Sequence, residues 1–212
     1  MRLLLVRHGQ SLGNIESRIQ GDDDPLTDHG RAQARAAARA LADRGDITHL
    51  YASTLMRAFE TASIIGRAIG LDPVPIPGLA EINAGTAAGM LWSEWSAQFP
   101  EEARRMASDD RYLEAWAGGE SGKTFSERVL AAYNEIVTRH QGTQDTVTVV
   151  SHGGALAWIS AHIHGDPMDV WPSARAGFVN CSISELEIDA AGQGEIIAWN
   201  QAGHLGALET AP

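Results

Sequence analysis

Hydrophobic positions along the chain fall into two patterns. Short runs of apolar and β-branched residues predict strands, whereas apolar residues spaced three or four positions apart predict amphipathic helices. The first pattern predicts strands at residues 2–7, 48–53, 146–150, 182–188 and 195–199. The second predicts helices at residues 28–43, 55–69, 124–140 and 154–164. Prolines at positions 73, 75 and 77 predict an extended segment after the second helix.

The order of these elements indicates the fold class. Strands that alternate with helices form a mostly parallel sheet with helices on both faces. We therefore expect an α/β protein with a three-layer α/β/α sandwich, in which the two late strands lie at or near an edge of the sheet. A length of 212 residues and a hydrophobic content of 44% fit one domain over residues 1–212.

Residues 85–122 interrupt the alternation. The stretch is rich in Trp, Ala and Glu and shows no clear periodicity. We expect residues 85–124 to be an irregular insertion that lies over the sheet as a cap or lid. Its aromatic side chains would either line an apolar cleft or form the core of the insertion itself. They are Trp92, Trp95, Phe99, Tyr112 and Trp116.

The charge of the chain limits the classes of partner. A net charge of −11 argues against nucleic acid and anionic membranes as partners. Lys123 is the only lysine, so nearly all positive charge is arginine, the side chain that binds phosphate or carboxylate with two parallel hydrogen bonds. An anionic substrate would therefore need a local pocket of arginines.

The single cysteine and the absence of long apolar runs indicate the compartment. Cys181 alone excludes an intrachain disulfide and structural cysteine-based metal sites, which fits a reducing cytoplasm. No apolar stretch approaches the ~20 residues of a membrane span, and the first strand begins at once without a leader. We expect a soluble, cytoplasmic protein.

Two histidines directly follow two apolar strands. His8 follows Leu3-Leu4-Leu5-Val6-Arg7, and His152 follows the β-branched run that ends at Ser151. Ligands of open α/β sheets bind outside the carboxyl ends of strands, and free N–H groups at a helix N-terminus bind anions. We therefore expect both imidazoles to face one oxyanion site, although each histidine alone could be an ordinary loop residue.

Two further charged residues are weaker candidates. Arg57 follows the second strand, where a helix-surface arginine is the alternative, and Glu81 follows the proline-stiffened segment, where a solvated loop charge is the alternative. The remaining histidines lack a strand-end position. His162 and His164 point to different sides of a predicted helix, so we expect no metal site.

Taken together, the motifs resemble the histidine phosphatase superfamily, which includes cofactor-dependent phosphoglycerate mutases, fructose-2,6-bisphosphatases and broad-specificity phosphatases. The resemblance covers most of the chain. It rests on four motifs in order, namely Arg7-His8-Gly9 with Ser11 and Asn14, Ser53 with Arg57 and Thr61-Ala62, Glu81, and Ser151-His152-Gly153-Gly154. The segment Gln20-Gly21 followed by Pro25-Leu26-Thr27 and Gly30 is similar to the family's loop into its first helix.

The resemblance implies a role for each of these residues. His8 would attack phosphorus and form a phosphohistidine, Arg7, Arg57 and His152 would bind the phosphoryl oxygens, and Glu81 would donate the proton. Asn14, Ser11, Gln20, Gly21 and Gly153 would contact the substrate. The resemblance implies a small phosphorylated substrate, no cofactor and no metal, and a homodimer is common in the family.

Two departures from the family pattern favour a phosphatase over a mutase. Residues 85–89 read Gly-Thr-Ala-Ala-Gly where many members carry an aromatic-rich stretch, and the Tyr-Gly-x-Leu-x-Gly-x-Asn-Lys segment of the mutases is absent. The insertion supplies Arg104, Arg105 and Arg111 but more acidic residues, among them Asp109 and Asp110. We therefore expect a metal-independent phosphomonoester hydrolase, with a cofactor-dependent phosphoglycerate mutase and a non-catalytic phosphate-binding protein as alternatives.

A further alternative comes from residues 9–13. Gly9-Gln10-Ser11-Leu12-Gly13 matches the G-x-S-x-G nucleophile elbow of α/β-hydrolases, and His152-Gly153-Gly154 is similar to their oxyanion-hole motif. The chain order argues against this interpretation, because the elbow follows several strands and the oxyanion motif precedes the serine in that fold.

Overall fold

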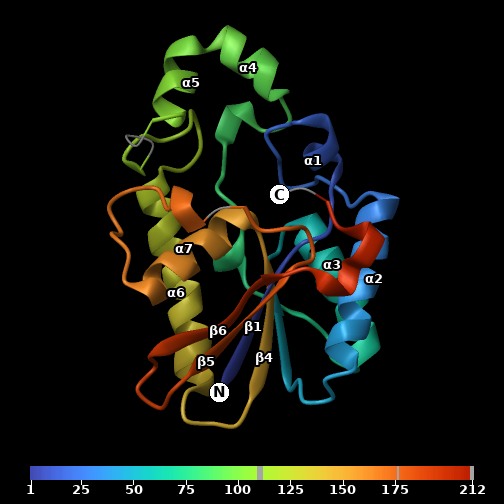
Figure 1. Cartoon of the computed structure of the whole chain (residues 1–212). Coiled ribbons are helices and arrows are strands. Elements are labelled where there is room, and N and C mark those ends of the chain that lie inside the picture. Colours follow the sequence, from blue (N-terminus) through green and yellow to red (C-terminus); the bar gives the residue numbers. More distant parts are fainter. Residues whose placement is uncertain (109–111, 176, 211–212) are drawn as a thin grey trace.

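The computed structural model describes residues 1–108, 112–175 and 177–210; Asp109, Asp110 and Arg111 of the insertion therefore lie outside the described residues. The described chain forms a six-stranded sheet with the order β3-β2-β4-β1-β5-β6 (Figure 1). The strands are β1 (Arg2–Arg7), β2 (His49–Ala52), β3 (Val74–Pro75), β4 (Thr146–Ser151), β5 (Ile183–Ile188) and β6 (Gly194–Gln201).

The sheet is mostly parallel, as the sequence predicts. Strands β3, β2, β4 and β1 run in one direction, and β5 pairs antiparallel with both β1 and β6. The late strands form the edge, with β6 outermost. The register of β1 on β4 pairs Arg7 with Ser151, so the two central strands end side by side.

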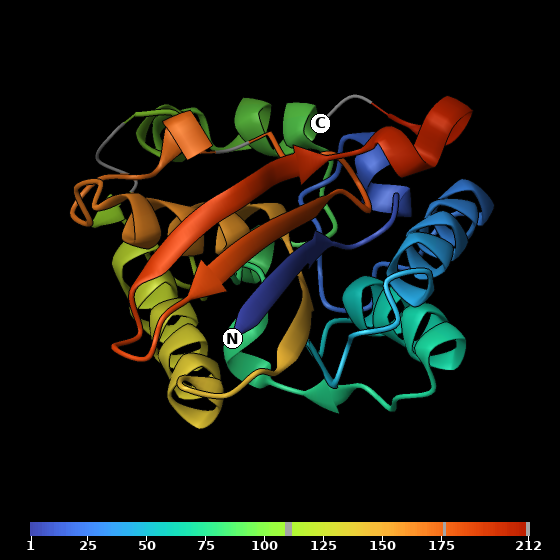
Figure 2. The same ribbon diagram turned by 60° about the horizontal axis from the view of Figure 1, so that its bottom comes forward.

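Helices cover both faces of the sheet (Figure 2) and confirm the three-layer sandwich. Side chains of β1 alternate between two cores: Leu4 and Val6 pack toward α2 and α3, whereas Leu3 and Leu5 pack toward α6 and α7. The helices are α2 (Asp28–Ala42) and α3 (Met56–Ile69) on one face, and α6 (Gly122–His140) and α7 (Gly153–His164) on the other. Within the described chain, no helix is long and apolar enough to span a membrane.

Side-chain caps fix where two of these helices begin. The Thr27 side chain accepts a hydrogen bond from the Gly30 N–H at the start of α2, and the Ser121 side chain accepts one from the Thr124 N–H at the start of α6. Helix α3 ends at Gly70, which adopts a positive φ of 75° that a residue with a side chain would resist.

The described part of residues 85–122, called the cap from here on, lies above the carboxyl ends of the parallel strands (Figure 1). The expectation of an irregular segment was wrong in one respect, because the cap contains the helices α4 (Trp92–Gln98) and α5 (Pro100–Met106). Each is two turns long, too short for a clear periodic signal, as is the five-residue helix α1 (Leu12–Glu16). Four 3-10 turns complete the described elements, at Pro77–Leu79, Gly85–Ala87, Ser173–Arg175 and Gly203–Leu208.

Candidate active site

His8 and His152 lie together because β1 and β4 are register neighbours. The His8 N–H donates to the Ser151 carbonyl oxygen at 2.9 Å, so the residue after β1 lies beside the end of β4. The two imidazole centroids are 5.1 Å apart, and the residues are only 2% and 0% exposed. The expected convergence of two strand-end histidines is therefore present.

The hydrogen bonds of His8 leave its Nε2 as the nucleophilic atom. His8 Nδ1 is 2.7 Å from the Gly9 carbonyl oxygen, and since a carbonyl only accepts, Nδ1 carries the proton. Arg57 Nε donates to His8 Nε2 at 3.3 Å, which shows that the Nε2 lone pair is available. Burial, followed by the charges of Arg57 and Arg7, holds the pKa of His8 well below its usual value, so the ring is neutral at neutral pH.

His152 presents one bonded and one unbonded ring nitrogen. Its Nε2 is 2.8 Å from the hydroxyl of Ser53, which follows β2 and is itself buried. Its Nδ1 is buried and has no partner in the described structure. Burial, followed by the charges of Arg57, His8 and Arg7, lowers the pKa of His152. A bound dianion would counter these positive charges and favour the protonated ring.

Arg57 is buried, Arg7 is half-buried, and both are only partly hydrogen-bonded. Arg57, the second residue of α3, is 0% exposed and donates from Nη1 to the Gly21 carbonyl oxygen at 2.8 Å. It is therefore not a helix-surface arginine. Arg7 donates from Nη1 to the Phe178 carbonyl oxygen. Burial lowers the pKa of both guanidinium groups, and the negative charge of Glu81 acts in the opposite direction on both.

Three nitrogen atoms of this cluster are buried without a hydrogen-bond partner in the described structure. They are Arg7 Nε, Arg57 Nη2 and His152 Nδ1. A buried donor without an acceptor costs about 1–3 kcal/mol, and more when it is charged. Natural proteins retain such donors where a ligand supplies the acceptors. Two guanidinium donors, together with an imidazole nitrogen that donates when the His152 ring is protonated, lie in the cluster around a nucleophilic nitrogen and fit the oxygens of a phosphoryl group.

Glu81 is fixed at the N-terminus of α7. Its carboxylate accepts from the N–H of Ile82 at 3.0 Å and from the N–H of Gly154 at 2.9 Å. A Cβ on Gly154 would lie 2.4 Å from Glu81 Oε1, so only glycine allows this approach. Ser151 helps to place the segment, because its hydroxyl donates to the Leu79 carbonyl oxygen at 2.7 Å. Glu81 is therefore held in place by backbone groups and is not a solvated loop charge.

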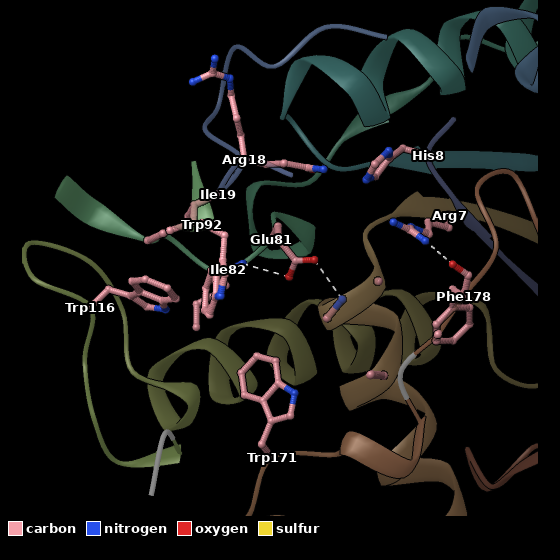
Figure 3. A pocket seen from close by; sticks show the side chains of 16 residues that line it. Arg7, His8, Arg18, Ile19, Glu81, Ile82, Trp92, Trp116, Trp171 and Phe178 are labelled. Carbon is pink, nitrogen blue, oxygen red and sulfur yellow. Dashed lines mark hydrogen bonds between the residues drawn. The ribbon is translucent and has the colours of Figure 1, made fainter. Parts of the chain in front are cut away.

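These residues open into a cavity of about 430 Å³ under the cap. Figure 3 shows Glu81 between Arg7 and His8 on one side and a group of aromatic side chains on the other. The cavity is lined by Arg7, His8, Arg18, Ile19, Gln20, Glu81, Ile82, Ala84, Trp92, Trp116, Gly153, Gly154, Ala157, Trp171, Gly177 and Phe178. Arg57 and His152 lie behind this lining, fully buried.

A family model described as the histidine phosphatase superfamily (branch 1) matches residues 3–202. The chain belongs to the histidine phosphatase superfamily. It is 38% identical over 194 residues to a glucosyl-3-phosphoglycerate phosphatase of Mycolicibacterium vanbaalenii, covering 87% of this chain and 83% of the relative. It is 31% identical over 209 residues to a metal-independent phosphoserine phosphatase of Arabidopsis thaliana, covering 97% of this chain and 84% of that protein.

A solved structure of a histidine phosphatase has the same fold. The native mycobacterial glucosyl-3-phosphoglycerate phosphatase matches with a TM-score of 0.81 and 31% identity, over 95% of this chain and 99% of the other. The expected superfamily and fold are thereby confirmed.

Among the predicted substrate-contacting residues of this histidine phosphatase domain, two line the cavity and three do not. Gln20 and Gly153 line it. Gly21 does not, but its carbonyl oxygen accepts a hydrogen bond from Arg57. Ser11 is buried and donates to an Asp24 carboxylate oxygen at 2.8 Å. Asn14 Oδ1 accepts from the Ser11 N–H at 3.0 Å. A direct substrate contact of Ser11 or Asn14 stays a prediction.

The hydrogen bond of Ser11 also bears on the nucleophile-elbow alternative. An elbow serine is exposed and bonded to a histidine, whereas the Ser11 hydroxyl is buried and bonded to Asp24 and Asn14. The rejection of an α/β-hydrolase is confirmed.

The aromatic residues of the cap divide between both expected roles. Trp92 and Trp116 line the cavity. Trp95 is 4% exposed and forms a small core of the cap, against which Phe99 packs. Tyr112 instead contacts the main core, with its ring 5.7 Å from that of Trp158.

Sequence reasoning missed several residues of the site, and four of them bear on its chemistry. Arg18, Trp171 and Phe178 line the cavity. Asn180 donates from Nδ2 to the His8 carbonyl oxygen at 3.0 Å and to Asn14 Oδ1 at 3.5 Å, so it fixes the backbone of the nucleophile. These residues lie in irregular segments without periodicity, and only tertiary contact brings them to the site.

Proposed function

We propose that this protein hydrolyses phosphomonoesters of small metabolites without a metal ion, through a phosphohistidine formed on His8. His8 Nε2 would attack phosphorus, the ester P–O bond would break, and the leaving alkoxide would take a proton. Water would then attack the phosphohistidine, which releases inorganic phosphate and restores the neutral imidazole. The observation that carries the proposal is the set of three unpaired buried donors next to an unprotonated, buried imidazole nitrogen.

In this mechanism the donors replace the metal ions that other phosphoryl-transfer enzymes use. The transferring group carries negative charge on three equatorial oxygens, and preorganised donors stabilise that charge at no cost of reorganisation. Such donors come from Arg7 at the end of β1, Arg57 in the first turn of α3 and His152 after β4, with Gly153 beside Arg7 at the start of α7. The three nitrogen atoms are buried, and a charge acts more strongly at a buried position than in water.

Glu81 is our proposed proton donor: its carboxylic acid form would give a proton to the leaving alkoxide, and the resulting carboxylate would accept a proton from the attacking water in the second half-reaction. Its carboxyl group lines the cavity, and Figure 3 shows it between His8 and the aromatic side chains, where we expect the leaving group to lie. Its two backbone hydrogen bonds fix its direction while leaving further lone pairs for the substrate oxygen.

We expect Glu81→Gln to lower kcat on an alkyl phosphate by about 10²–10⁴-fold and on nitrophenyl phosphate by much less, because nitrophenolate leaves without protonation. The amide oxygen can still accept from Gly154, so the loop stays in place. Steady-state rates on both substrates, with the exposed cap variant Glu94→Gln as control, measure the difference. Equal losses on the two substrates would contradict the role of proton donor.

The lining of the cavity supports the proposal that the substrate is a small metabolite that carries a ring. Trp92, Trp116, Trp171 and Phe178 offer apolar faces beyond the phosphoryl site. Among the described residues of this lining, Arg18 is the one additional cation, and it already forms an ion pair with Glu16 and donates to the Gly89 carbonyl oxygen at 2.8 Å. The relatives named as phosphatases of glucosyl-3-phosphoglycerate and phosphoserine act on small phosphorylated metabolites, which supports the same class here.

A mutase is the less favoured alternative, and a direct assay separates the two activities. A mutase binds a doubly anionic phosphoglycerate in two orientations and shields its phosphohistidine from water, which calls for several free cations. Incubation with 3-phosphoglycerate, with and without 2,3-bisphosphoglycerate, should release inorganic phosphate faster than it yields 2-phosphoglycerate. Isomerisation more than about tenfold faster than phosphate release would reverse the assignment.

We place the protein in the cytoplasm. Its only cysteine, Cys181, is a buried free thiol, which fits a reducing compartment. A homodimer remains an expectation from the family resemblance.

A further inference from the structure

A second group of chemistry-bearing side chains lies at the opposite end of the sheet from His8. His49 begins β2, His140 is the last residue of α6, and Asp145 directly precedes β4. One ligand atom from each lies within 4.8 Å of the others. The active site occupies the carboxyl ends of the parallel strands, whereas this cluster occupies their amino ends, so the two sites are separate.

We propose that His49, His140 and Asp145 bind a divalent transition-metal ion, with Zn²⁺ as the best fit. Imidazole nitrogens and a carboxylate oxygen are ligands that Zn²⁺ prefers. Asp145 Oδ2 is 2.8 Å from His140 Nδ1 and 3.9 Å from His49 Nδ1. Ligands of a tetrahedral Zn²⁺ with bonds of about 2.0–2.1 Å lie about 3.3 Å apart. The two distances from Asp145 are close to this value, and all three ligand atoms lie within 4.8 Å of one another, so small side-chain rotations bring them to one ion.

The second ring nitrogen of His140 has the partner that a metal-bound histidine requires. His140 Nε2 is 2.9 Å from the hydroxyl of Tyr51, which is buried in the main core and fixes the ring. Metal-ligating histidines almost always donate their other N–H to an oxygen acceptor, ordinarily a carboxylate, a backbone carbonyl or water, and the Tyr51 oxygen would take that role here. When the ion binds Nδ1, the ring proton moves to Nε2 and is donated to the Tyr51 oxygen, so the change needs no net loss of a proton from a neutral ring.

His49 provides the open side of the site. Its side chain is 43% exposed, compared with 4% for His140. Its Nδ1 is 2.9 Å from the Thr48 hydroxyl, which also donates to the Thr146 carbonyl oxygen at 3.2 Å. Thr48 therefore keeps a hydrogen bond when His49 turns to the metal. Because His49 is exposed to solvent, the ion can enter from this side, and a water molecule can serve as its fourth ligand.

The ion would have a structural role and stabilise the folded state. It would join the start of β2 to the turn between α6 and β4, a segment that lies far from β2 in the sequence. An ion that binds only the folded state raises its stability by mass action. Its distance from His8 leaves phosphoryl transfer unaffected, and the inference does not rest on the proposed function.

Zn²⁺ titration of chelator-treated protein tests the site. We expect calorimetry to give one Zn²⁺ per chain for the wild type and for the control His162→Gln, an exposed histidine of α7. His49→Gln should weaken binding at least about tenfold, and so should Tyr51→Phe, which keeps all three ligands but removes the partner of His140. Zn²⁺ should raise the melting temperature of the wild type and the control but not of His49→Gln.

Two measurements distinguish the proposed zinc site from a catalytic metal site and from nonspecific metal binding. Phosphatase turnover should be the same with and without the single equivalent of Zn²⁺, in the wild type and in His49→Gln. Co²⁺ bound in place of Zn²⁺ should show the intense visible bands of a four-coordinate ion. Failure of the wild type to bind Zn²⁺, or equal affinity of His49→Gln, would overturn the proposal whatever the phosphatase assay gives.

Discussion

His8→Ala is expected to abolish turnover, with a loss of about four to six orders of magnitude in kcat, because it removes the atom that accepts the phosphoryl group. The imidazole makes one hydrogen bond to the backbone, at Gly9, and accepts one from Arg57, so its loss should leave the fold intact. Phosphate release from several monoesters measures the loss, and the melting temperature reports the fold.

The matched control for this variant is His162→Ala, an exposed histidine outside the cavity, which should keep full activity. Retention of more than about one hundredth of the wild-type rate by folded His8→Ala would show that another group or a water molecule attacks phosphorus directly.

Arg57→Ala is expected to lower kcat by about 10³-fold, because Arg57 Nη2 is a buried donor without a partner that would bind a phosphoryl oxygen in the transition state. Stability should change far less than turnover. The side chain forms hydrogen bonds to Gly21 and His8, but its removal also relieves a buried, incompletely paired charge.

Two further variants make the Arg57 test specific. Arg57→Lys keeps the charge but loses the planar fork, so it should recover only a small part of the lost rate. Arg67→Ala removes an exposed arginine from the same helix and should leave kcat unchanged. If Arg57→Ala melts much earlier while its folded fraction turns over normally, Arg57 is a structural residue.

The central part of the site could be predicted from the sequence because it depends on local pattern and on parallel register. A histidine that follows a buried strand lies at a strand end, and neighbouring parallel strands bring two such residues together. His8 and His152 meet in this way, through the pairing of Arg7 with Ser151. The prediction of Arg57 and Glu81 as site residues depended on the family resemblance, because an arginine on a helix and a carboxylate in a loop are ordinarily solvated.

The remaining features of the structure depend on tertiary contacts that no local sequence pattern encodes. Arg18 and Trp171 reach the cavity from irregular segments on either side of it. Ser11 has the offset expected of a substrate contact, yet its hydroxyl bonds to Asp24. His49 and His140 each occupy ordinary element ends, and only the packing of α6 beside β2 and β4 brings them together near Asp145. The short cap helices lack the length that periodicity requires.

The measurement that tests the central claim most directly is the identification of the phosphorylated intermediate. Wild-type protein in EDTA is mixed rapidly with nitrophenyl phosphate, whose fast-leaving group favours accumulation of the phosphoenzyme, and is quenched in alkali, in which phosphohistidine persists. We expect mass spectrometry to find one phosphoryl group on His8, formed at a rate consistent with turnover and absent from His8→Ala. A phosphoryl group on another residue, no phosphoenzyme during sustained turnover, or loss of turnover in EDTA that added metal restores would contradict the metal-independent phosphohistidine mechanism.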